Sequence, residues 1–394
     1  MFDPRTEAKK YEQTIIEWRR ALHRVPEVGT DLPQTTALIR GALEEMGYAV
    51  ETYSNNGMRA VLKGAKDGPV IAFRADMDAL PVREETGLPF ASRNGCMHAC
   101  GHDAHAAMLL GAARVLMDHR EDLAGSVIFL FQPAEETTGG AKTMIEEGCL
   151  KDPDATRFIS MHTGNLFKDV PSGCIGWRKG PLFAGAMPFY VTVKGRGGHA
   201  GRPHEAVDPI PIACEMIQSL QRFVSRELPP VHGNVVTVGM IHGGTIVNVI
   251  PDEVKFGGSI RTLHEEDAAK LRERIPAILK GIAEADGAEA DVEYIELYPP
   301  TVNDPESAEF LADCARSVLG EENVVEIEEP TMGSEDVAFY LREVPGSYAI
   351  LSSHKAAADG VCYPHHSPRF DIDESVLHLG TAVFCRCAQE HCKG

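Results

Sequence analysis

The sequence predicts an α/β protein with a mostly parallel sheet, into which a smaller α+β domain is inserted. Short apolar runs that end in polar clusters alternate with helical patterns in the first and last parts of the chain, as in sheets with helices on both faces. The middle of the chain has a different order of elements. The length of 394 residues also exceeds one typical domain, so we expect two.

The first and last parts of the chain supply the predicted sheet. Residues 5–24 have the apolar spacing of an amphipathic helix, which ends before Pro26. Val70–Phe73 is a continuous apolar run, as expected of a strand that is buried on both faces. Polar residues follow it, and ligands bind beyond the carboxyl ends of strands in such sheets. Further strands are predicted at 47–53, 58–63, 127–131, 158–161 and 348–351, and helices at 103–117 and 140–148.

The middle of the chain predicts a small domain of its own. Its elements follow the order β-α-β-β-α-β, which is that of the ferredoxin-like split βαβ arrangement. We therefore expect a discontinuous first domain of residues 1–184 and 298–394, with residues 185–297 inserted into it. The predicted strands of the insert are 189–194, 234–241, 253–261 and 289–296, and its predicted helices are 207–224 and 265–286.

Composition and charge argue against several classes of function. The net charge is −20 and there is no run of Lys or Arg, so no nucleic-acid partner is expected. No stretch reaches about 18 apolar residues, so no membrane span is expected. The chain begins with a charged, helix-like segment that lacks the apolar core of a signal peptide, which predicts a cytoplasmic protein. Most of the ten cysteines are therefore expected to be buried thiols.

The strongest chemical signal is the segment His98–His105, which holds three His, one Cys and one Asp in eight residues. Cys100 and His102 sit just before the predicted helix, whose dipole lowers the pKa of a nearby thiol and favours the thiolate that a metal needs. Gly101 allows a tight turn between them. The alternative is a cluster of core histidines under a helix, but burying many polar groups without partners is costly.

Carboxylates follow two of the predicted strands. Glu135 and Glu136 are adjacent, and they repel each other unless a cation or a proton is shared. One of them can bind a metal while its neighbour acts as a general base on water. Asp76 and Asp78 follow the strand at 70–73, where a carboxylate can orient a metal-bound histidine. The alternatives are a solvated loop for the Glu pair and a capping role for the Asp residues.

Histidines in two further segments complete a predicted metal centre. Taken alone, each is read as a core or surface histidine. Together the segments offer five ligands, one more than a structural zinc takes. Five ligands suit two divalent metals that share the Cys100 thiolate, and the donor types allow Zn, Mn, Co or Ni. The candidates are Cys100, His102, Glu136, His162 and one of His365 and His366.

The inserted domain contributes a second group of candidates. His199 lies in a glycine-rich turn after a predicted strand, and Asn248 and Arg261 follow later in the insert. A histidine can stabilise an oxyanion, and an arginine can clamp a carboxylate. Taken alone, turn chemistry and a surface arginine are the favoured interpretation of these residues.

The segments together resemble one known family. The chain is similar, over nearly its whole length and in the family's order, to the metallopeptidase family of aminoacylases and glutamate carboxypeptidases, in its amidohydrolase (hippurate hydrolase) branch. The segments that carry the resemblance are FRADMDALPV (73–82), MHACGHDAH (97–105), FQPAEE (131–136), MH (161–162), GGHAGRPH (197–204), GGTIVNVIPDE (243–253), MGSEDVAFY (332–340) and HSPRFDIDE (366–374).

The resemblance implies a role for each candidate residue. Glu135 is expected to be the general base, and Asp78 is expected to orient the metal site. The resemblance implies that His199 stabilises the oxyanion, while Asn248 and Arg261 hold the carboxylate of the substrate. His366 is preferred to His365 because the family pattern is His followed by Ser/Asn-Pro. The implied metal ligands are Cys100, His102, Glu136, His162 and His366.

The resemblance also implies a fold, an activity and partners. It implies an α/β zinc-peptidase-like catalytic domain with an inserted lid or dimerisation domain, and a homodimer formed through that insert. The expected activity is hydrolysis of the amide bond of N-acyl amino acids by a metal-activated water, with small acyl-amino acids or short peptides as substrates. The alternatives are a dipeptidase or carboxypeptidase on the same scaffold, a hydrolase with Cys100 as nucleophile and His102 or His105 as its base, and a non-catalytic metal- or ligand-binding protein.

Overall fold

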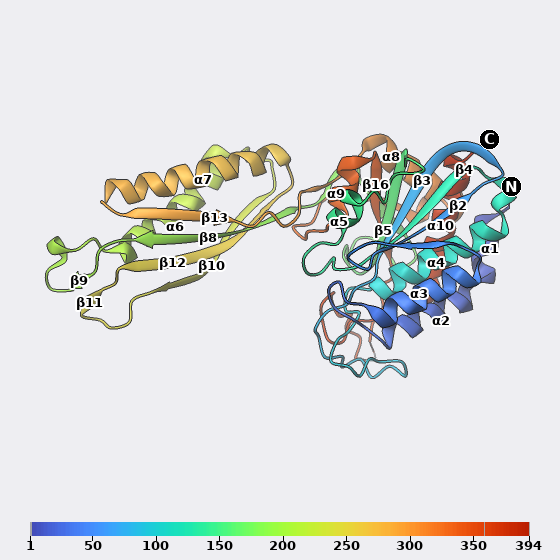
Figure 1. Ribbon diagram of the computed structural model, residues 1–394, viewed down its shortest axis with the longest axis horizontal. Coiled ribbons are helices and arrows are strands. Elements are labelled where there is room, and N and C mark those ends of the chain that lie inside the picture. Colours follow the sequence, from blue (N-terminus) through green and yellow to red (C-terminus); the bar gives the residue numbers. More distant parts are fainter. Residues whose placement is uncertain (1, 358, 394) are drawn as a thin grey trace. The chain divides into compact units, whose positions relative to one another are not determined.

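The computed structural model describes residues 2–357 and 359–393, which form two compact units (Figure 1). Unit 1 contains the chain up to Gly180, Val302–Glu329 and the chain from Asp336 onward, and unit 2 contains Pro181–Thr301 and Pro330–Glu335. The inserted unit is therefore slightly longer at both ends than the expected 185–297. No sequence pattern indicated that the short segment 330–335 belongs to unit 2.

Unit 1 is built on an eight-stranded sheet. Its central strands β4, β3, β5 and β16 are parallel to one another. The sheet is nevertheless mixed rather than mostly parallel, because β1–β2, β2–β4 and β6–β16 pair antiparallel. A short turn joins β1 to β2, and such a turn permits only antiparallel pairing. The strands in order across the sheet are β1 (Val50–Thr52), β2 (Met58–Lys63), β4 (Ala124–Gln132), β3 (Lys66–Asp76), β5 (Arg157–Gly164), β16 (Gly346–Ser352), β6 (Ile175–Trp177) and β15 (Val324–Glu326).

Helices cover both faces of the parallel strands. The ring of Phe73 on β3 lies 4.9 Å from that of Phe384 on α10, and the ring of Phe158 on β5 lies 4.9 Å from that of Tyr340 on α9. Because Phe158 is the cross-strand partner of Ala72, it points to the opposite face from Phe73. The helices of unit 1 are α1 (Pro4–Lys10), α2 (Glu12–His23), α3 (Pro33–Glu45), α4 (His102–Asp118), α5 (Ala141–Glu146), α8 (Pro305–Leu319), α9 (Ala338–Glu343) and α10 (Leu377–His391).

The helix predicted over 5–24 is divided into α1 and α2 at Tyr11. Tyr11 leaves helical geometry, with φ −99° and ψ 6°, and its hydroxyl donates to Asp118 at the end of α4. The sequence pattern does not mark this break, because the apolar spacing continues across it. Within the described residues, no helix combines the length and the apolar character that crossing a membrane requires.

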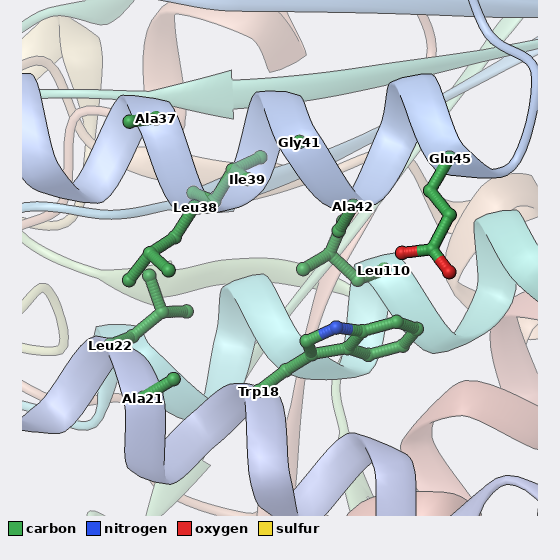
Figure 2. Close-up of a pocket in the computed structure, with 10 residues that line it drawn as sticks. All are labelled: Trp18, Ala21, Leu22, Ala37, Leu38, Ile39, Gly41, Ala42, Glu45 and Leu110. Atoms are coloured by element: carbon green, nitrogen blue, oxygen red, sulfur yellow. The ribbon is translucent and has the colours of Figure 1, made fainter.

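A pocket of about 270 Å³ lies between α2 and α3 (Figure 2). Trp18 and Leu22 of α2 face Leu38 and Ala42 of α3 across it. Glu45 is the one charged residue among those that line it, and none of the residues expected to carry chemistry does so. Specific ligand sites combine an apolar lining with several converging polar groups, so this pocket is not the candidate functional site.

Unit 2 contains the β-α-β-β-α-β order that the sequence predicts. Its four strands pair antiparallel in the order β10-β12-β8-β13, and α6 and α7 pack on the sheet. Two short strands, β9 and β11, form a separate pair. The elements are β8 (Gly185–Lys194), β9 (Gly198–His199), α6 (Pro209–Glu227), β10 (Asn234–Gly243), β11 (Val249–Ile250), β12 (Glu253–Thr262), α7 (Glu265–Ala285) and β13 (Glu289–Tyr294), while β7 (Gly180–Phe183) and β14 (Thr301–Asn303) fall near the points where the chain passes between the units.

A buried arginine joins three segments of unit 1. Arg19 of α2 is 1% exposed, and its guanidinium lies 2.8 Å from Asp103 of α4 and 3.0 Å from Glu374. The Nδ1 atom of His23 also lies 2.8 Å from Asp103. Burial opposes ionisation of Asp103, but Arg19 and His23 outweigh it and hold the pKa of this carboxyl well below its usual value. Arg19 therefore fixes the first turn of α4, where the candidate metal ligands begin.

Replacing Arg19 should destabilise the fold strongly. In an Arg19→Met variant the buried Asp103 carboxylate loses its main counter-charge, which typically costs about 3–5 kcal/mol. Arg20→Met is the matched control, because Arg20 is 39% exposed in its ion pair with Glu374 and such pairs contribute about 1 kcal/mol or less. Denaturant unfolding of both variants measures the difference. Equal, small losses would contradict a structural role for Arg19.

Candidate metal centre and active site

The carboxyl ends of three parallel strands bring the candidate residues of unit 1 together. Strand β3 ends at Asp76 and β4 at Gln132, while β5 carries His162 near its end. Because β3 pairs in parallel with both β4 and β5, these ends meet at one edge of the sheet. Helix α4 begins at His102, and Gly101 before it has φ +87°, the left-handed backbone expected of this glycine.

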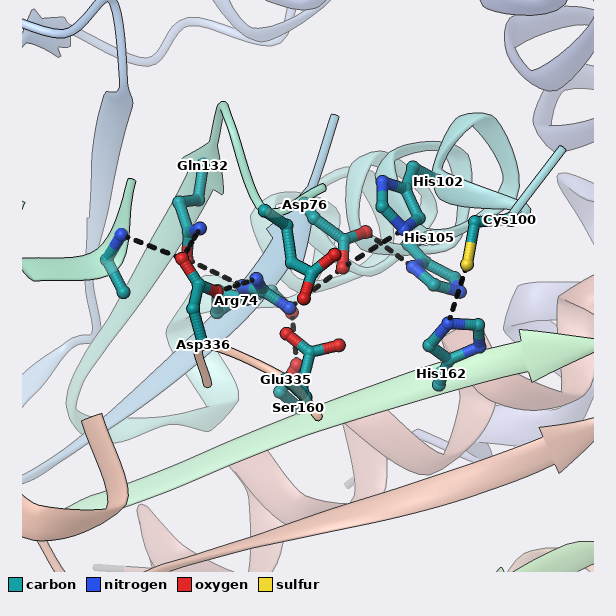
Figure 3. A network of polar contacts seen from close by, with 12 residues as sticks. Arg74, Asp76, Cys100, His102, His105, Gln132, Ser160, His162, Glu335 and Asp336 are labelled. Carbon is teal, nitrogen blue, oxygen red and sulfur yellow. Dashed lines mark hydrogen bonds and ion pairs between the residues drawn. The ribbon is translucent and has the colours of Figure 1, made fainter. Parts of the chain in front are cut away.

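The donor atoms form two clusters that share one sulfur atom. In the first, donor atoms of Cys100, His102 and Glu136 all lie within 4.8 Å of one another. In the second, the Cys100 Sγ atom lies 3.4 Å from His162 Nε2 and 3.6 Å from His365 Nδ1. Figure 3 shows Cys100 pointing toward His162, with His102 beside it on α4. This arrangement is compatible with the predicted bridging role of the Cys100 thiolate.

The chemistry of these donors fits divalent cations. The ring of His102 is buried, yet its nitrogens lie 3.5 Å from Asp78 Oδ1 and 3.9 Å from Glu136 Oε1 and make no hydrogen bond. Burial opposes a charged imidazole there, but Asp76 and Asp78 outweigh it and raise the pKa of His102 to about 10. Buried imidazole nitrogens that face carboxylates without a hydrogen bond are the arrangement expected of residues that bind a cation.

The surroundings of Cys100 argue against direct attack by its sulfur. Burial raises the pKa of the Cys100 thiol well above its usual value, and the neighbouring carboxylates of Glu136 and Glu135 add to the effect. A nucleophilic cysteine needs the opposite environment, with positive charge and a lowered pKa. The hydrolase with Cys100 as nucleophile is therefore disfavoured, whereas a thiol that releases its proton when a cation binds the sulfur is compatible with this site.

A buried hydrogen-bond network fixes the orientation of His162. The Nδ1 atom of His105 lies 2.5 Å from Asp76 Oδ1, and its Nε2 atom accepts from the backbone N–H of Thr163 at 2.7 Å. His162 Nδ1 donates to the carbonyl of the same Thr163 at 2.7 Å. His162 therefore carries its proton on Nδ1 and turns the Nε2 lone pair toward Cys100. Arg74 pairs with Asp76 at 2.8 Å (Figure 3).

The sequence did not assign His105 or Arg74 a role beside the metal ligands. His105 follows His102 by three residues, so both project from the same face of α4, and this spacing was the available signal. For Arg74 the only local signal was Asp76 two residues later, because its other partners come from distant segments. One of these partners, Asp336, lies 2.7 Å from Arg74 and reaches it from a distant part of the chain.

Asp78 holds the backbone that presents the Glu pair. Its two carboxylate oxygens accept from the backbone N–H groups of Glu135 at 3.0 Å and Glu136 at 3.1 Å. Ala134, just before them, has φ +61°, a left-handed conformation that costs a non-glycine residue about 1–3 kcal/mol and is most frequent at functional sites. Glu135 is only 6% exposed. Asp78 thus positions both carboxylates through their main chain.

The two adjacent histidines lie in different clusters. His365 lies in the cluster with Cys100 and His162. His366 has a left-handed backbone, with φ +66°, and its Nε2 atom lies 3.1 Å from Glu136 Oε1 in the first cluster instead. Gly164 leaves room for the His365 ring, since a Cβ atom there would lie 2.2 Å from His365 Nε2.

A hydrogen bond to His365 separates the two histidines chemically. The backbone N–H of Asn165 donates to His365 Nε2 at 3.1 Å. In a neutral imidazole the proton then resides on Nδ1, so His365 presents an N–H group rather than a lone pair to Cys100. His366 Nε2 faces a carboxylate of the donor set and remains a candidate ligand.

The candidate residues of unit 2 fall into two places. His199 on β9 pairs with Val249 on β11, and the carbonyl of Asn248 accepts from Ala200 N at 3.1 Å, so His199 and Asn248 are neighbours. Gly201 N donates to His199 Nδ1 at 3.0 Å, which leaves a proton on Nε2 of this exposed ring. Arg261 is at the other end of the sheet, near the end of β12.

Arg261 is half-buried, and its Nη1 atom donates to Ser334 Oγ at 2.6 Å. Glu253 and Arg261 lie eight residues apart on β12, and strands rise about 3.3 Å per residue, so the two ends are about 26 Å apart. Strands β9 and β11 lie at the Glu253 end (Figure 1). Within one copy of unit 2, His199 and Arg261 are therefore too far apart to contact the same small molecule.

Comparison with known proteins assigns the chain to a family. The family model for peptidase family M20/M25/M40 matches residues 72–390, a range that contains every candidate residue. The chain belongs to this peptidase family. An IAA-amino acid hydrolase of Arabidopsis thaliana is 38% identical over 383 residues, which cover 96% of this chain and 85% of that protein. Thermostable carboxypeptidase 1 of Saccharolobus solfataricus is 37% identical over 382 residues, 95% of each chain.

A solved structure supports the metal content. The crystal structure of a dinuclear metal-binding peptidase of the M20 family from Bacillus subtilis has a TM-score of 0.82 and 33% sequence identity, and the match covers 98% of this chain and 99% of that one. The resemblance drawn from the motifs is thereby confirmed. This M20 peptidase is a hydrolase, and its family supports a centre for two divalent metals.

Metal analysis should separate the two adjacent histidines of this M20 hydrolase. We expect His366→Ala to bind one metal equivalent fewer than the wild type, because its Nε2 atom offers a lone pair to the donor set. His365→Ala should bind as many equivalents as the wild type, since Nδ1 of His365 carries a proton. Elemental analysis after loading with Zn²⁺ and dialysis measures this. Loss of a metal from His365→Ala alone would make His365 the ligand and reverse the assignment.

Proposed function

We propose that this M20 hydrolase cleaves the amide bond of N-acyl amino acids and releases the free amino acid. The proposal is carried by one observation, the pair of donor clusters that share Cys100 beside the turn holding Glu135. Amide hydrolysis requires an activated water and a polarised carbonyl group. Two neighbouring metal sites are suited to supply both. The IAA-amino acid hydrolase is similar over nearly all of this chain.

Two divalent cations would be held by the five ligands that the motifs indicate. Zn and Mn suit the mixture of thiolate, imidazole and carboxylate donors, and Co and Ni are alternatives. When bound, such cations lower the pKa of water and polarise a carbonyl oxygen. The proposed ligands are Cys100, His102, Glu136, His162 and His366.

Glu135 is the proposed general base. It takes a proton from the attacking water as the carbon–oxygen bond forms, and it passes that proton to the amine nitrogen as the carbon–nitrogen bond breaks. Its backbone is fixed by the hydrogen bond to Asp78, so its carboxylate is presented from a rigid turn. Asp78 acts through this turn and does not itself exchange a proton in the proposed reaction.

Residues of unit 2 are proposed to bind the rest of the substrate. Nε2 of His199 carries a proton and can donate to the oxyanion of the tetrahedral intermediate. Asn248 and Arg261 are proposed to hold the carboxylate of the amino acid, for which a guanidinium is well suited. His199 and Arg261 lie at opposite ends of β12, so we propose that they reach one substrate from two different copies of the chain.

A homodimer formed through unit 2 is therefore part of the proposal. Strand β10 is an edge of the four-stranded sheet and pairs only with β12 among the described strands. Its residues Val235, Met240 and Ile241 are between 39% and 47% exposed. An exposed apolar edge strand is a surface that pairs readily with another strand, and a second copy of β10 is the proposed partner.

A carboxypeptidase or dipeptidase is the second candidate function. The relative named thermostable carboxypeptidase 1 favours it at an identity similar to that of the amino acid hydrolase. Both activities release an amino acid with a free carboxylate, so both need the same carboxylate clamp. They differ in the group on the other side of the amide bond, which is an acyl group in one case and a peptide in the other.

A substrate panel tests the proposal. We expect hydrolysis of N-acyl amino acids such as hippurate or N-acetyl amino acids, loss of activity with chelator, and recovery with added Zn²⁺ or Mn²⁺. The carboxamide analogue of the best substrate should be cleaved about 10- to 100-fold less efficiently, because a charge-assisted hydrogen bond contributes about 1.5–3 kcal/mol.

An Arg261→Met variant is the matched control for that panel and should lose most of the preference for the free carboxylate. Dipeptides cleaved faster than every acyl amino acid would favour the second candidate. Absence of hydrolysis across the panel by a fully metal-loaded protein would reject the proposed substrate class.

Glu135→Gln should separate catalysis from metal binding. The amide keeps the size of the side chain but cannot accept the proton, so kcat should fall by about 100- to 10,000-fold. The metal content should be unchanged, because Glu135 is not among the proposed ligands. Steady-state kinetics and elemental analysis of the same preparation measure both quantities. Near-normal kcat in this variant would remove Glu135 from its role.

A further inference from the structure

A second group of metal-binding side chains lies in unit 2, where it shares no residue with the two-metal centre. His232 precedes β10, His264 immediately precedes α7, and Glu266 is in the first turn of α7. One donor atom from each of the three lies within 4.8 Å of the others. The two imidazole rings stack with centroids 3.8 Å apart and planes inclined by 22°.

A buried carboxylate orients His232. Asp267 is 2% exposed, and its Oδ2 atom accepts from His232 Nδ1 at 2.8 Å and from Asn234 Nδ2 at 2.8 Å. Because the proton of His232 is on Nδ1, the lone pair is on Nε2, which is directed away from this carboxylate. Histidines that ligate metals commonly donate their other N–H to a carboxylate in this way, which fixes the tautomer and strengthens the ligand.

The distance between two of the three side chains suits a single small ion. His264 Nδ1 and Glu266 Oε1 are 3.8 Å apart. Two ligand atoms that are each about 2.1 Å from one zinc ion can be at most about 4.2 Å apart, so these atoms already lie within range. The side chains of His232 and His264 are 23% and 29% exposed, and that of Glu266 is 69% exposed. Solvent can therefore reach the group and complete the coordination.

We propose that His232, His264 and Glu266 bind a divalent transition-metal ion of the Zn²⁺, Co²⁺ and Ni²⁺ class. Two imidazoles and one carboxylate are the donors that these ions accept readily, whereas Mg²⁺ and Ca²⁺ prefer oxygen alone. The acidic residues of the first turn of α7, including Glu265, place negative charge beside the ion. Bound metal ties the segment before β10 to the start of α7, and this site contains no sulfur.

Cobalt titration of the full-length protein tests the proposal. The metal-free protein is titrated with Co²⁺, and total bound metal is counted while absorbance follows the sulfur-to-cobalt charge-transfer band that Cys100 would give. We expect the wild-type chain to bind one more equivalent than His264→Ala, with the same charge-transfer band in both. Glu266→Gln should weaken binding of that equivalent, and Asp267→Asn should weaken it about 10- to 100-fold.

The control is His242→Ala, which removes an exposed histidine of unit 2 outside the group and should leave the stoichiometry unchanged. Because His264 and Glu266 are partly exposed, both variants should keep the wild-type circular dichroism spectrum. Equal metal stoichiometry in the wild type, His264→Ala and Glu266→Gln would overturn the proposal. The comparison rests on a difference of one equivalent, so it holds whether or not the two-metal centre fills as proposed above.

Discussion

Buried negative charge is the constraint on which the rest of this structure depends. Asp76 and Asp78 are fully buried at the end of β3, and an unpaired carboxylate in such a place costs several kcal/mol or more. Burial alone would raise the pKa of Asp76, but His102, His105 and Arg74 outweigh it and hold this pKa well below its usual value. The edge of the sheet is therefore organised around compensating that charge.

The same compensation explains how the metal ligands are held. Asp76 fixes His105, which binds the Thr163 peptide, and that peptide sets the tautomer of His162. Asp78 likewise fixes the Glu pair, because it accepts hydrogen bonds from the backbone N–H groups of Glu135 and Glu136. His102 and His162 come from a helix start and a strand end, whereas Cys100, Glu136 and His366 lie in connecting segments. Hydrogen bonds hold these segments, such as the one from the backbone N–H of His366 to the carbonyl of Ala99 at 2.8 Å. A site that must hold cations at fixed separations benefits from such rigid supports.

Unit 2 has a different design. Its sheet has its own core, and its functional candidates are on turns and strand ends rather than inside that core. His199 on β9 and Arg261 on β12 lie near opposite ends of the sheet, which is the reason that the proposed site draws on two copies of the chain. The proposed His232 site would stiffen another part of the same unit, at the start of α7.

The sequence by itself determined the four main strands of the insert with their β-α-β-β-α-β order, the strands of the large sheet apart from β6 and β15, and the donor types of the Cys100 segment. These features follow from local spacing, from apolar runs and from the chemistry of side chains a few residues apart. It predicted a mostly parallel sheet, whereas the sheet is mixed. The direction in which two strands pair depends on which segments meet in space. The sequence identified five candidate ligands, but it did not give the distances between them.

Only the tertiary structure decided which residues complete the site. His105 and Arg74 acquire their roles partly from Thr163 and Asp336, which are remote in sequence, so the spacing of His105 from His102 and of Arg74 from Asp76 could not establish these roles alone. The proposed preference for His366 over His365 rests on a left-handed backbone angle and on one hydrogen bond from Asn165. The chemistry of a side chain follows from its residue type, whereas the partner that orients this side chain is set by long-range packing.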